Sequence, residues 1–579
     1  MNEQQNLLIA MVLALLVLVG FQYFFAPPPT APRAPGPEQA EAPETQAGRS
    51  QASSAGNDEN GFGAGAQQGQ AVPRELALAR SPRLPIETPS LTGSLALVGG
   101  RIDDLTLRNY FNEPGREGGN VLLLNPAGSE DAYYAGFGWL PHDDQGLLTP
   151  GLDTEWTTEA TRLTPDTPVT LRWTSPQGLE FVREISVDDK YMFTIKQRVR
   201  NPRETPAVLK PFALINRRGT PATQGFFILH EGPLGVFDSG LKEVDYDTLR
   251  EDGPFRASSV GGWLGITDKY WLTAIVPEQD VPFDGRFLFD AGRTAPRYQA
   301  DYLEKELVVS AGESKQVTVR FFAGAKEVDA INRYESAYDI KLFDRAIDWG
   351  WFLFLTKPIF FVLDWLYGLM GNFGFAILAL TVLVKLLFFP LANKSYVSMS
   401  KMKLVQPKMK RLQERYKDDK ARLQQEMMEL YKKEKINPMS GCLPILIQIP
   451  VFFALYKVLF VTIEMRHAPG FFWVDDLSAP DPLVITNLFG LIPWDPPGFL
   501  ALGIWPILMG VAMFFQMRLN PSTGDEMQRK ILLAMPFVFM FILASFPAGL
   551  VIYWTWNTVL TALQQWMIMR RHGVASAGE

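Results

Sequence analysis

Apolar and polar residues follow three different patterns along the chain. Long apolar runs occur at 7–25 and repeatedly after residue 373, short runs with a period of two occupy 84–323, and a highly charged stretch fills 393–442. A run of about 20 apolar residues can span the roughly 30 Å hydrocarbon core of a bilayer, and a period of two predicts half-buried strands. The chain is therefore predicted to be a multi-domain membrane protein that carries a large all-β domain.

The apolar runs predict six membrane spans. The first is an uncleaved anchor within 1–26, because no basic residue precedes its apolar run as in a signal peptide. The other five form an all-α core within 373–579. Their predicted ranges are 373–391, 443–463, 499–517, 531–546 and 550–569.

The apolar segment that ends near 370 is expected to differ from these spans. Pro358 interrupts it, and Lys357 and Asp364 fall on one helical face. We therefore predict connecting and interfacial amphipathic helices over 326–372. With six spans, the charged stretch 393–442, the basic loop 518–530 and the C-terminal tail lie on the same side of the membrane. The positive-inside rule then predicts both termini in the cytoplasm and the β-domain outside.

A linker and a sandwich are predicted between the anchor and the helices. Residues 27–85 are rich in Pro, Ala, Gly, Gln and Ser, a composition typical of a disordered linker. From 86 to 325, strand patterns recur, with a hairpin at 181–199 and the same alternation at 306–324. They predict an all-β sandwich. A sugar-binding or sugar-processing sandwich is one interpretation, although His142 and His230 are its only histidines.

Composition limits the chemistry. One Cys and four scattered His exclude an intrachain disulfide and argue against a metal site, and no P-loop motif is present. We expect no cofactor and no metal. Residues 27–350 are acidic overall, and the remainder of the chain is mildly basic. The charged stretch 393–442 reads as a helical hairpin that is either a solvated coil or a docking surface for a partner or for anionic head groups.

Lys385 is the most informative residue of the predicted spans. A charge inside a span is costly and indicates a wet cavity or a partner, and no Asp or Glu lies in any span to pair with it. Thr381 lies one turn earlier on the same face. The bundle is thus predicted to enclose a hydrated groove, whose further polar and aromatic candidates are Gln448, Gln516, Tyr553, Trp554 and Asn557. A channel or secondary transporter with a periplasmic binding domain is the alternative, although neither paired repeats nor membrane carboxylates are visible.

Three ordered motifs resemble those of one family. The segments KMKLVQPKMK, EMMELYKKEKINPMSGCLPILIQIPVFFALY and FPAGLVIYWTWNTVLTALQQ are similar to the YidC-type membrane protein insertases, in their Gram-negative form with a large periplasmic domain. The resemblance implies a groove open to the cytoplasm and to lipid, and a β-supersandwich shaped like sugar mutarotases but without their activity. Lys385 stands where the family usually has Arg, and Trp554 where a second Tyr often follows. A substrate slide is implied near Ile449, Pro450, Phe452 and Ile542.

The resemblance also implies the function. We expect a protein of the bacterial inner membrane that inserts nascent membrane proteins and helps them fold and assemble. It would act alone or with the Sec translocon and its accessory subunits. We expect transfer into the bilayer without bond chemistry, so the protein is not expected to be an enzyme. The ribosome is a possible partner through 393–442, without direct readout of nucleic acid.

Overall fold

The computed structural model describes residues 71–116, 118–142, 145–223, 229–292, 294–416, 419–434, 443–489, 491–492, 494, 496, 501–519 and 526–571. The predicted anchor in 1–26 and the larger part of the predicted linker lie outside these residues. The chain divides into two compact units, Met1–Asp348 and Trp349–Glu579.

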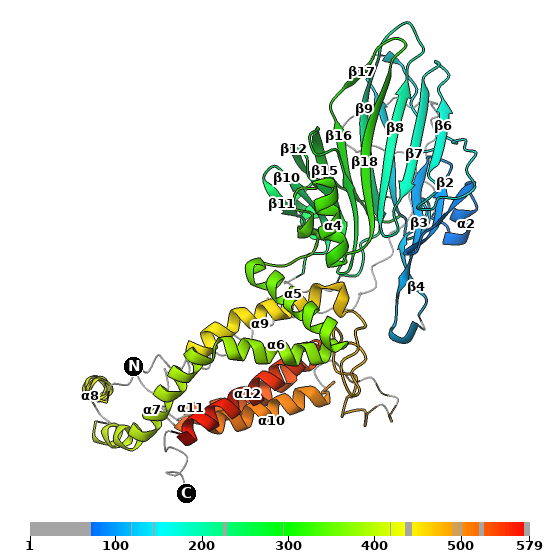
Figure 1. The fold of residues 1–579 in the computed structure, drawn as a ribbon. Helices are drawn as coiled ribbons and strands as arrows, with labels where there is room; N and C mark the ends of the chain where they lie inside the picture. The colour runs from blue at the N-terminus through cyan, green and yellow to red at the C-terminus, as the bar shows by residue number, and fades with distance from the viewer. Residues whose placement is uncertain are drawn as a thin grey trace, which may run out of the picture. The chain divides into compact units, whose positions relative to one another are not determined.

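Two antiparallel sheets make up the first unit (Figure 1). The ten-stranded sheet has, in spatial order, β1 (Arg83–Glu87), β2 (Leu91–Ala96), β3 (Arg101–Phe111), β5 (Tyr133–Pro141), β9 (Ala207–Arg218), β16 (Arg297–Glu304), β15 (Pro282–Asp290) and β12 (Phe255–Val260), with β4 (Asn120–Leu124) beside β3 and β17 (Leu307–Val309) beside β9. The eight-stranded sheet has the order β11 (Gly240–Glu243), β10 (Gly232–Phe237), β13 (Trp263–Thr267), β14 (Trp271–Val276), β18 (Ser314–Ala325), β8 (Met192–Arg200), β7 (Glu180–Val187) and β6 (Val169–Thr174).

Short helices accompany the sheets. They are α2 (Arg74–Leu78), η2 (Pro114–Arg116), α3 (Tyr246–Asp252), α4 (Val328–Tyr338) and η4 (Phe343–Ala346). Helix α2 and strand β1 show that regular structure begins before residue 86, where the linker was expected to end.

The hairpin predicted at 181–199 is confirmed. Strands β7 and β8 pair antiparallel, with Phe181 opposite Val199 and Ile185 opposite Ile195. Every second residue of β7 is buried, beginning with Phe181. The alternation arises because successive side chains of a strand point to opposite faces.

The second strand pair has a different arrangement from the first. Although 306–324 alternates like 181–199, β17 pairs with β9 of one sheet and β18 pairs with β8 and β14 of the other. The segment between them is therefore a crossover and not a hairpin turn. The period of two identifies a strand but does not specify its partner, which depends on contacts distant in sequence.

The two sheets enclose the core of the unit. Ring contacts cross between them, for example Phe137 of β5 against Phe321 of β18. Arg183 of β7 is buried to 1% exposure, donates to the carbonyls of Gly100 and Phe137, and lies 4.6 Å over the ring of Trp156. Burial lowers the pKa of Arg183 to about 9. The two hydrogen bonds from its terminal nitrogens to backbone carbonyls offset part of the cost of burying this charge.

The second unit is helical. Its helices are α5 (Leu353–Met370), α6 (Phe373–Leu387), α7 (Phe389–Arg415), α8 (Lys420–Lys433), α9 (Leu443–Val461), α10 (Ile504–Leu519), α11 (Glu526–Ile542) and α12 (Ala548–Arg571), with the short turns η6 (Ile463–Met465) and η7 (Leu543–Ser545). The tight connection predicted between the last two spans is present, because η7 and two further residues join α11 to α12.

The span predicted over 373–391 is not one straight helix. Helix α6 ends at Leu387, and α7 begins at Phe389 after a bend of 68°. Pro390 explains the break. In a continuous helix its ring would meet the carbonyl of Leu386, whereas in the first turn of α7 its missing N–H costs no hydrogen bond.

Helix α5 also corrects an expectation. It continues through Pro358, which was expected to interrupt it. The proline removes one bond near the start of the helix, and residues on both sides of it pack inward, including Thr356, Ile359 and Leu363. Among the described residues, α5 is the single helix long and apolar enough by itself to cross a membrane. Helix α6 with the start of α7 meets the test as a bent pair, and Gln448–Val461, Ile504–Leu519 and Leu533–Ser545 are shorter apolar helices.

Helices α7 and α8 form the charged hairpin predicted after the first core span. Met402, Val405 and Met409 of α7 are buried against Met427, Leu430 and Tyr431 of α8. Lys408 and Glu434 add an ion pair of 2.7 Å. A continuous apolar seam therefore joins the two helices, and their charged residues, such as Lys410 and Arg415, are exposed.

Candidate functional site

Three helices carry the polar side chains singled out in the sequence. Helix α12 contacts α6, α9 and α10, and α10 runs beside it in Figure 1. Thr381 and Lys385 lie on α6, Gln448 on α9 and Tyr553 on α12. Helices distant in sequence thus bring the predicted groove residues onto neighbouring surfaces.

Lys385 makes its hydrogen bond to a neutral partner. Its Nζ donates to Oγ1 of Thr561 at 2.7 Å, and that hydroxyl donates to the carbonyl of Asn557 at 2.6 Å. Within the described part of the chain, no carboxylate lies at ion-pair distance from Lys385. Thr381 is buried and donates to Ile377 of its own helix at 2.7 Å. The structure therefore pairs Lys385 with α12 and leaves its charge without a counterion in these residues.

A second contact joins α9 to α12. The amide nitrogen of Gln448 donates to the phenol oxygen of Tyr553, which is 2% exposed. One turn along α9, Phe452 meets Trp554 edge-on, with ring centroids 4.6 Å apart. Trp554 also lies 5.9 Å from Phe539 of α11. The indole thus contacts both helices between which a substrate slide is predicted.

The other predicted residues are more dispersed. Ile449 is 45% exposed on α9, and Pro450 is half-buried within the same helix. Ile542 is the half-buried last residue of α11. Gln516 is half-buried on α10 and, among the described residues, makes no hydrogen bond to the Lys385 group. Asn557 takes part through its backbone carbonyl.

Three residues of α12 were not among the predicted groove residues. Thr561, Gln564 and Gln565 are 8%, 7% and 1% exposed. The buried Nε2 of Gln564 has no hydrogen-bond partner among the described residues. With Asn557 they follow a spacing of four, seven and eight residues, which is one face of a helix, and that spacing was the available signal.

The loop that contains Gly470, Leu477 and Asp481 packs against the first turns of α6 and α12. The side chain of Asn372 accepts from the N–H of Phe375 at 3.2 Å and donates to the carbonyl of Gly470 at 2.7 Å. The N–H groups of Ala548 and Gly549 donate to loop carbonyls at 2.7 and 3.0 Å. The loop thus satisfies backbone groups that a helix N-terminus leaves unpaired.

Asp481 fastens this loop to α10. It is 5% exposed and accepts from the indole of Trp473 at 2.9 Å, the N–H of Leu483 at 3.1 Å and the N–H of Trp505 at 2.7 Å. Because Trp505 lies in the first turn of α10, the carboxylate also lies at the positive end of that helix. One buried side chain therefore holds the loop and the helix together.

No group of three or more His, Cys, Asp or Glu among the described residues is placed to hold a metal ion. His230 lies 3.2 Å from Asp245, and this hydrogen bond keeps the pKa of the carboxyl below its usual value. Burial, with the charge of Glu278, raises the pKa of Glu304 to about 7.

Comparison with known proteins agrees over nearly the whole chain. Residues 365–575 match the family described as 60Kd inner membrane protein, and residues 83–362 match the YidC periplasmic domain. The "Membrane protein insertase YidC" of Methylobacterium radiotolerans is 50% identical over 597 residues, covering 99% of this chain and 96% of the relative. The protein of the same name from Beijerinckia indica is 50% identical over 589 residues, covering 99% and 97%. A crystal structure of an active YidC insertase is 19% identical, has a TM-score of 0.35, and covers 83% of this chain and 94% of its own.

These matches identify the chain as a membrane protein insertase of the inner membrane, with a two-sheet periplasmic domain followed by a helical membrane region. The chain belongs to the YidC family, in the form that carries the periplasmic domain.

Proposed function

We propose that Lys385 and the polar side chains around it form the wall of a hydrated groove through which this insertase passes the polar tails of its substrates. The observation that carries the proposal is the hydrogen bond of Lys385 to Thr561 with no carboxylate nearby in the described residues. An intramembrane charge without a counterion requires water or a visiting anion. The buried, unpartnered amide of Gln564 supports a polar visitor on the same face.

The depth of Lys385 suits this role. It lies 12 residues after Phe373, the first residue of α6, which corresponds to about 18 Å of helix. The hydrocarbon core is roughly 30 Å thick, so the amine would lie slightly beyond its middle. A groove that opens toward the far end of α6 would then shorten the dry path of a tail by about a third or more.

The groove would act by lowering an electrostatic barrier. An Asp at the centre of a bilayer costs about 2.5–3.5 kcal/mol on insertion scales, and a transient contact with Lys385 would offset part of that cost. The apolar segment that follows would leave between α9 and α11, past Phe452 and Trp554. Ile449, Pro450 and Ile542 are the further candidates along this exit. Transfer of apolar area to lipid, at about 25 cal/mol per Å², would drive the step, so no covalent chemistry is required.

Membrane topology is part of the same proposal. Helices α6, α9, α10, α11 and α12 would form a five-helix core, with the anchor within 1–26 as a sixth span and both termini in the cytoplasm. Helix α5 would lie in the interface, and its strongly exposed Phe354, Trp365 and Leu369 suit contact with lipid. The Sec translocon and the ribosome are proposed partners, the latter through α7 and α8.

Site-specific photocrosslinking tests this proposal. A photoreactive residue replaces Ile449 or Phe452, and a stalled nascent membrane protein is presented to the full-length protein in membranes. Val511 on α10 is the matched control, because it is 48% exposed and Ile449 is 45% exposed. We expect adducts from both α9 positions and few from Val511. Equal yields from α9 and Val511 would show that the chain does not leave along α9.

A further inference from the structure

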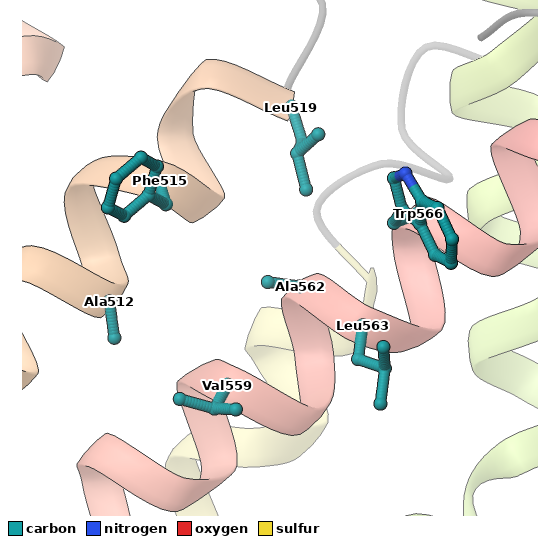
Figure 2. A pocket seen from close by; sticks show the side chains of 7 residues that line it. All are labelled: Ala512, Phe515, Leu519, Val559, Ala562, Leu563 and Trp566. Carbon is teal, nitrogen blue, oxygen red and sulfur yellow. The ribbon is translucent and has the colours of Figure 1, made fainter.

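An open apolar groove runs along the surface between α10 and α12. It has a volume of about 510 Å³ and is lined by Ala512, Phe515, Leu519, Val559, Ala562, Leu563 and Trp566 (Figure 2). Phe515, Leu563 and Trp566 are 59%, 49% and 44% exposed. Every lining residue is apolar, so the groove differs in chemistry from the polar face around Lys385.

Arginines flank one end of this groove. Figure 2 shows Ala512 and Val559 toward one end and Leu519 and Trp566 toward the other. Arg518 adjoins Leu519, and its guanidinium lies 4.7 Å from the ring centroid of Phe514. Arg570 follows Trp566 by one turn and lies 5.4 Å from its ring centroid. Both guanidinium groups are thus held by aromatic rings at the same end of the groove.

The charge of this end is positive. Arg518, Arg570 and the following Arg571 make no ion pair with any side chain that the structure describes, a set that excludes the side chains of 520–529 and 572–579. The C-termini of α10 and α12 contribute about half a negative charge each, which would repel an anion. Three guanidinium charges exceed that contribution, so an anionic group is favoured here.

The length of the groove selects its occupant. From Ala512 to Leu519, and from Val559 to Trp566, the lining extends over about 10 Å of helix. A partner helix that crosses the membrane would need contact over roughly 30 Å, whereas one leaflet supplies about half of that depth. The groove therefore suits an acyl chain of one leaflet. Trp566, in the last two turns of α12, would suit the membrane–water interface, where aromatic residues are enriched.

We propose that the α10–α12 groove binds one anionic phospholipid, with an acyl chain along Phe515 and Leu563 and its phosphate between Arg518 and Arg570. The apolar lining accepts the chain, and the two arginines select the head group. This site does not depend on the Lys385 groove or on the passage of a substrate.

Native mass spectrometry of the full-length protein tests the site. The protein is equilibrated with equal amounts of phosphatidylglycerol and phosphatidylcholine that have the same acyl chains, and the lipids retained are counted. We expect one retained lipid with at least a five-fold preference for phosphatidylglycerol. Arg518→Gln with Arg570→Gln should reduce the preference to near one. The control pair Arg411→Gln and Arg415→Gln, on exposed positions of α7, should preserve it.

Variants that fill the groove provide the second arm. Ala562→Phe should abolish retention of either lipid. If the phenylalanine prevents folding, the milder Ala512→Leu takes its place and should reduce retention. A phospholipid with a photoreactive acyl chain should label peptides that contain Phe515 or Leu563. Equal retention of the two lipids, a preference that survives the filled groove, or dimers crosslinked through Phe515 would each overturn the proposal.

Discussion

Replacing Asp481 by alanine should detach the loop that contains Gly470 and Asp481 from α10. The carboxylate accepts three hydrogen bonds at 5% exposure, from Trp473, Leu483 and Trp505. Hydrogen bonds to charged groups contribute about 1.5–3 kcal/mol each when buried, and water that enters the vacated space recovers part of this. A net loss of roughly 1 kcal/mol per bond gives about 3 kcal/mol for local opening.

Asparagine at the same position should have a smaller effect. The two contacts from Trp473 and Leu483 go to Oδ1, and the contact from Trp505 goes to Oδ2. An amide oxygen can keep the first pair, but the amide nitrogen would then face the N–H of Trp505. The free energy of local opening should fall by about 1–2 kcal/mol, which is less than in Asp481→Ala.

Hydrogen exchange measured by mass spectrometry, on the full-length protein in a bilayer mimic, reports this opening directly. A loss of about 3 kcal/mol corresponds to roughly a hundred-fold faster exchange, since 1.4 kcal/mol is a factor of ten. We expect that acceleration in Asp481→Ala for peptides covering Trp473 and Trp505. Asp475→Ala, at an exposed position of the same loop, is the control. Unchanged protection in Asp481→Ala, or equal acceleration in the control, would refute the reasoning.

Two further predictions concern the β-domain and the charged hairpin. Because burial and Glu278 raise the pKa of Glu304 from 4.5 to about 7, folding takes up a proton between these values, and stability falls as the pH rises from about 5 to 8. Glu304→Gln should remove this pH dependence of stability, which is worth up to about 3 kcal/mol. Hydrogen exchange of β16 at pH 5 and pH 8 measures it. A stability difference between the two pH values as large in the variant as in the wild type would count against the prediction. Met409→Asp places a carboxylate in the seam between α7 and α8, where Met409 is 2% exposed, at a cost of about 2–5 kcal/mol. Limited trypsin digestion should then cut this hairpin at least ten-fold faster than in the exposed control Lys410→Asp, and equal rates would contradict the seam.

Local patterns allowed the sequence to predict elements well. The alternation from Phe181 to Val199 predicted both strands of a hairpin, because a period of two on each side of a short polar turn is a local pattern. The hairpin of α7 and α8 was equally accessible from its helical spacing.

Arrangements that depend on distant residues could not be obtained in this way. The alternation around Val317 identified a strand, but its pairing with β8 depends on residues more than a hundred positions away. Pro390 was visible within the run 373–391, yet the hydropathy of its neighbours concealed the helix break at Phe388.

The candidate site was predictable only in part, because local patterns identify single residues but not their distant partners. Hydropathy alone singled out Lys385, because a charge in an apolar run is costly. Its partner Thr561 lies 176 residues away on α12, and no local pattern connects the two. The buried Gln564 and Gln565 are polar positions on a helix that hydropathy averages treat as apolar.

The charge of Lys385 is the central claim, and its removal is the most direct test. The full-length protein, as Lys385→Ala or Lys385→Arg, is reconstituted in vesicles with a substrate whose translocated tail contains Asp, and with the same substrate carrying Asn instead. Up to 2.5–3.5 kcal/mol is at stake for one Asp at the bilayer centre, so a contact worth only half of it changes the rate by about ten-fold. The account predicts that Lys385→Ala slows insertion of the Asp tail at least ten-fold and leaves the Asn tail nearly unchanged, while Lys385→Arg retains both. Normal insertion of the Asp tail by Lys385→Ala would contradict it.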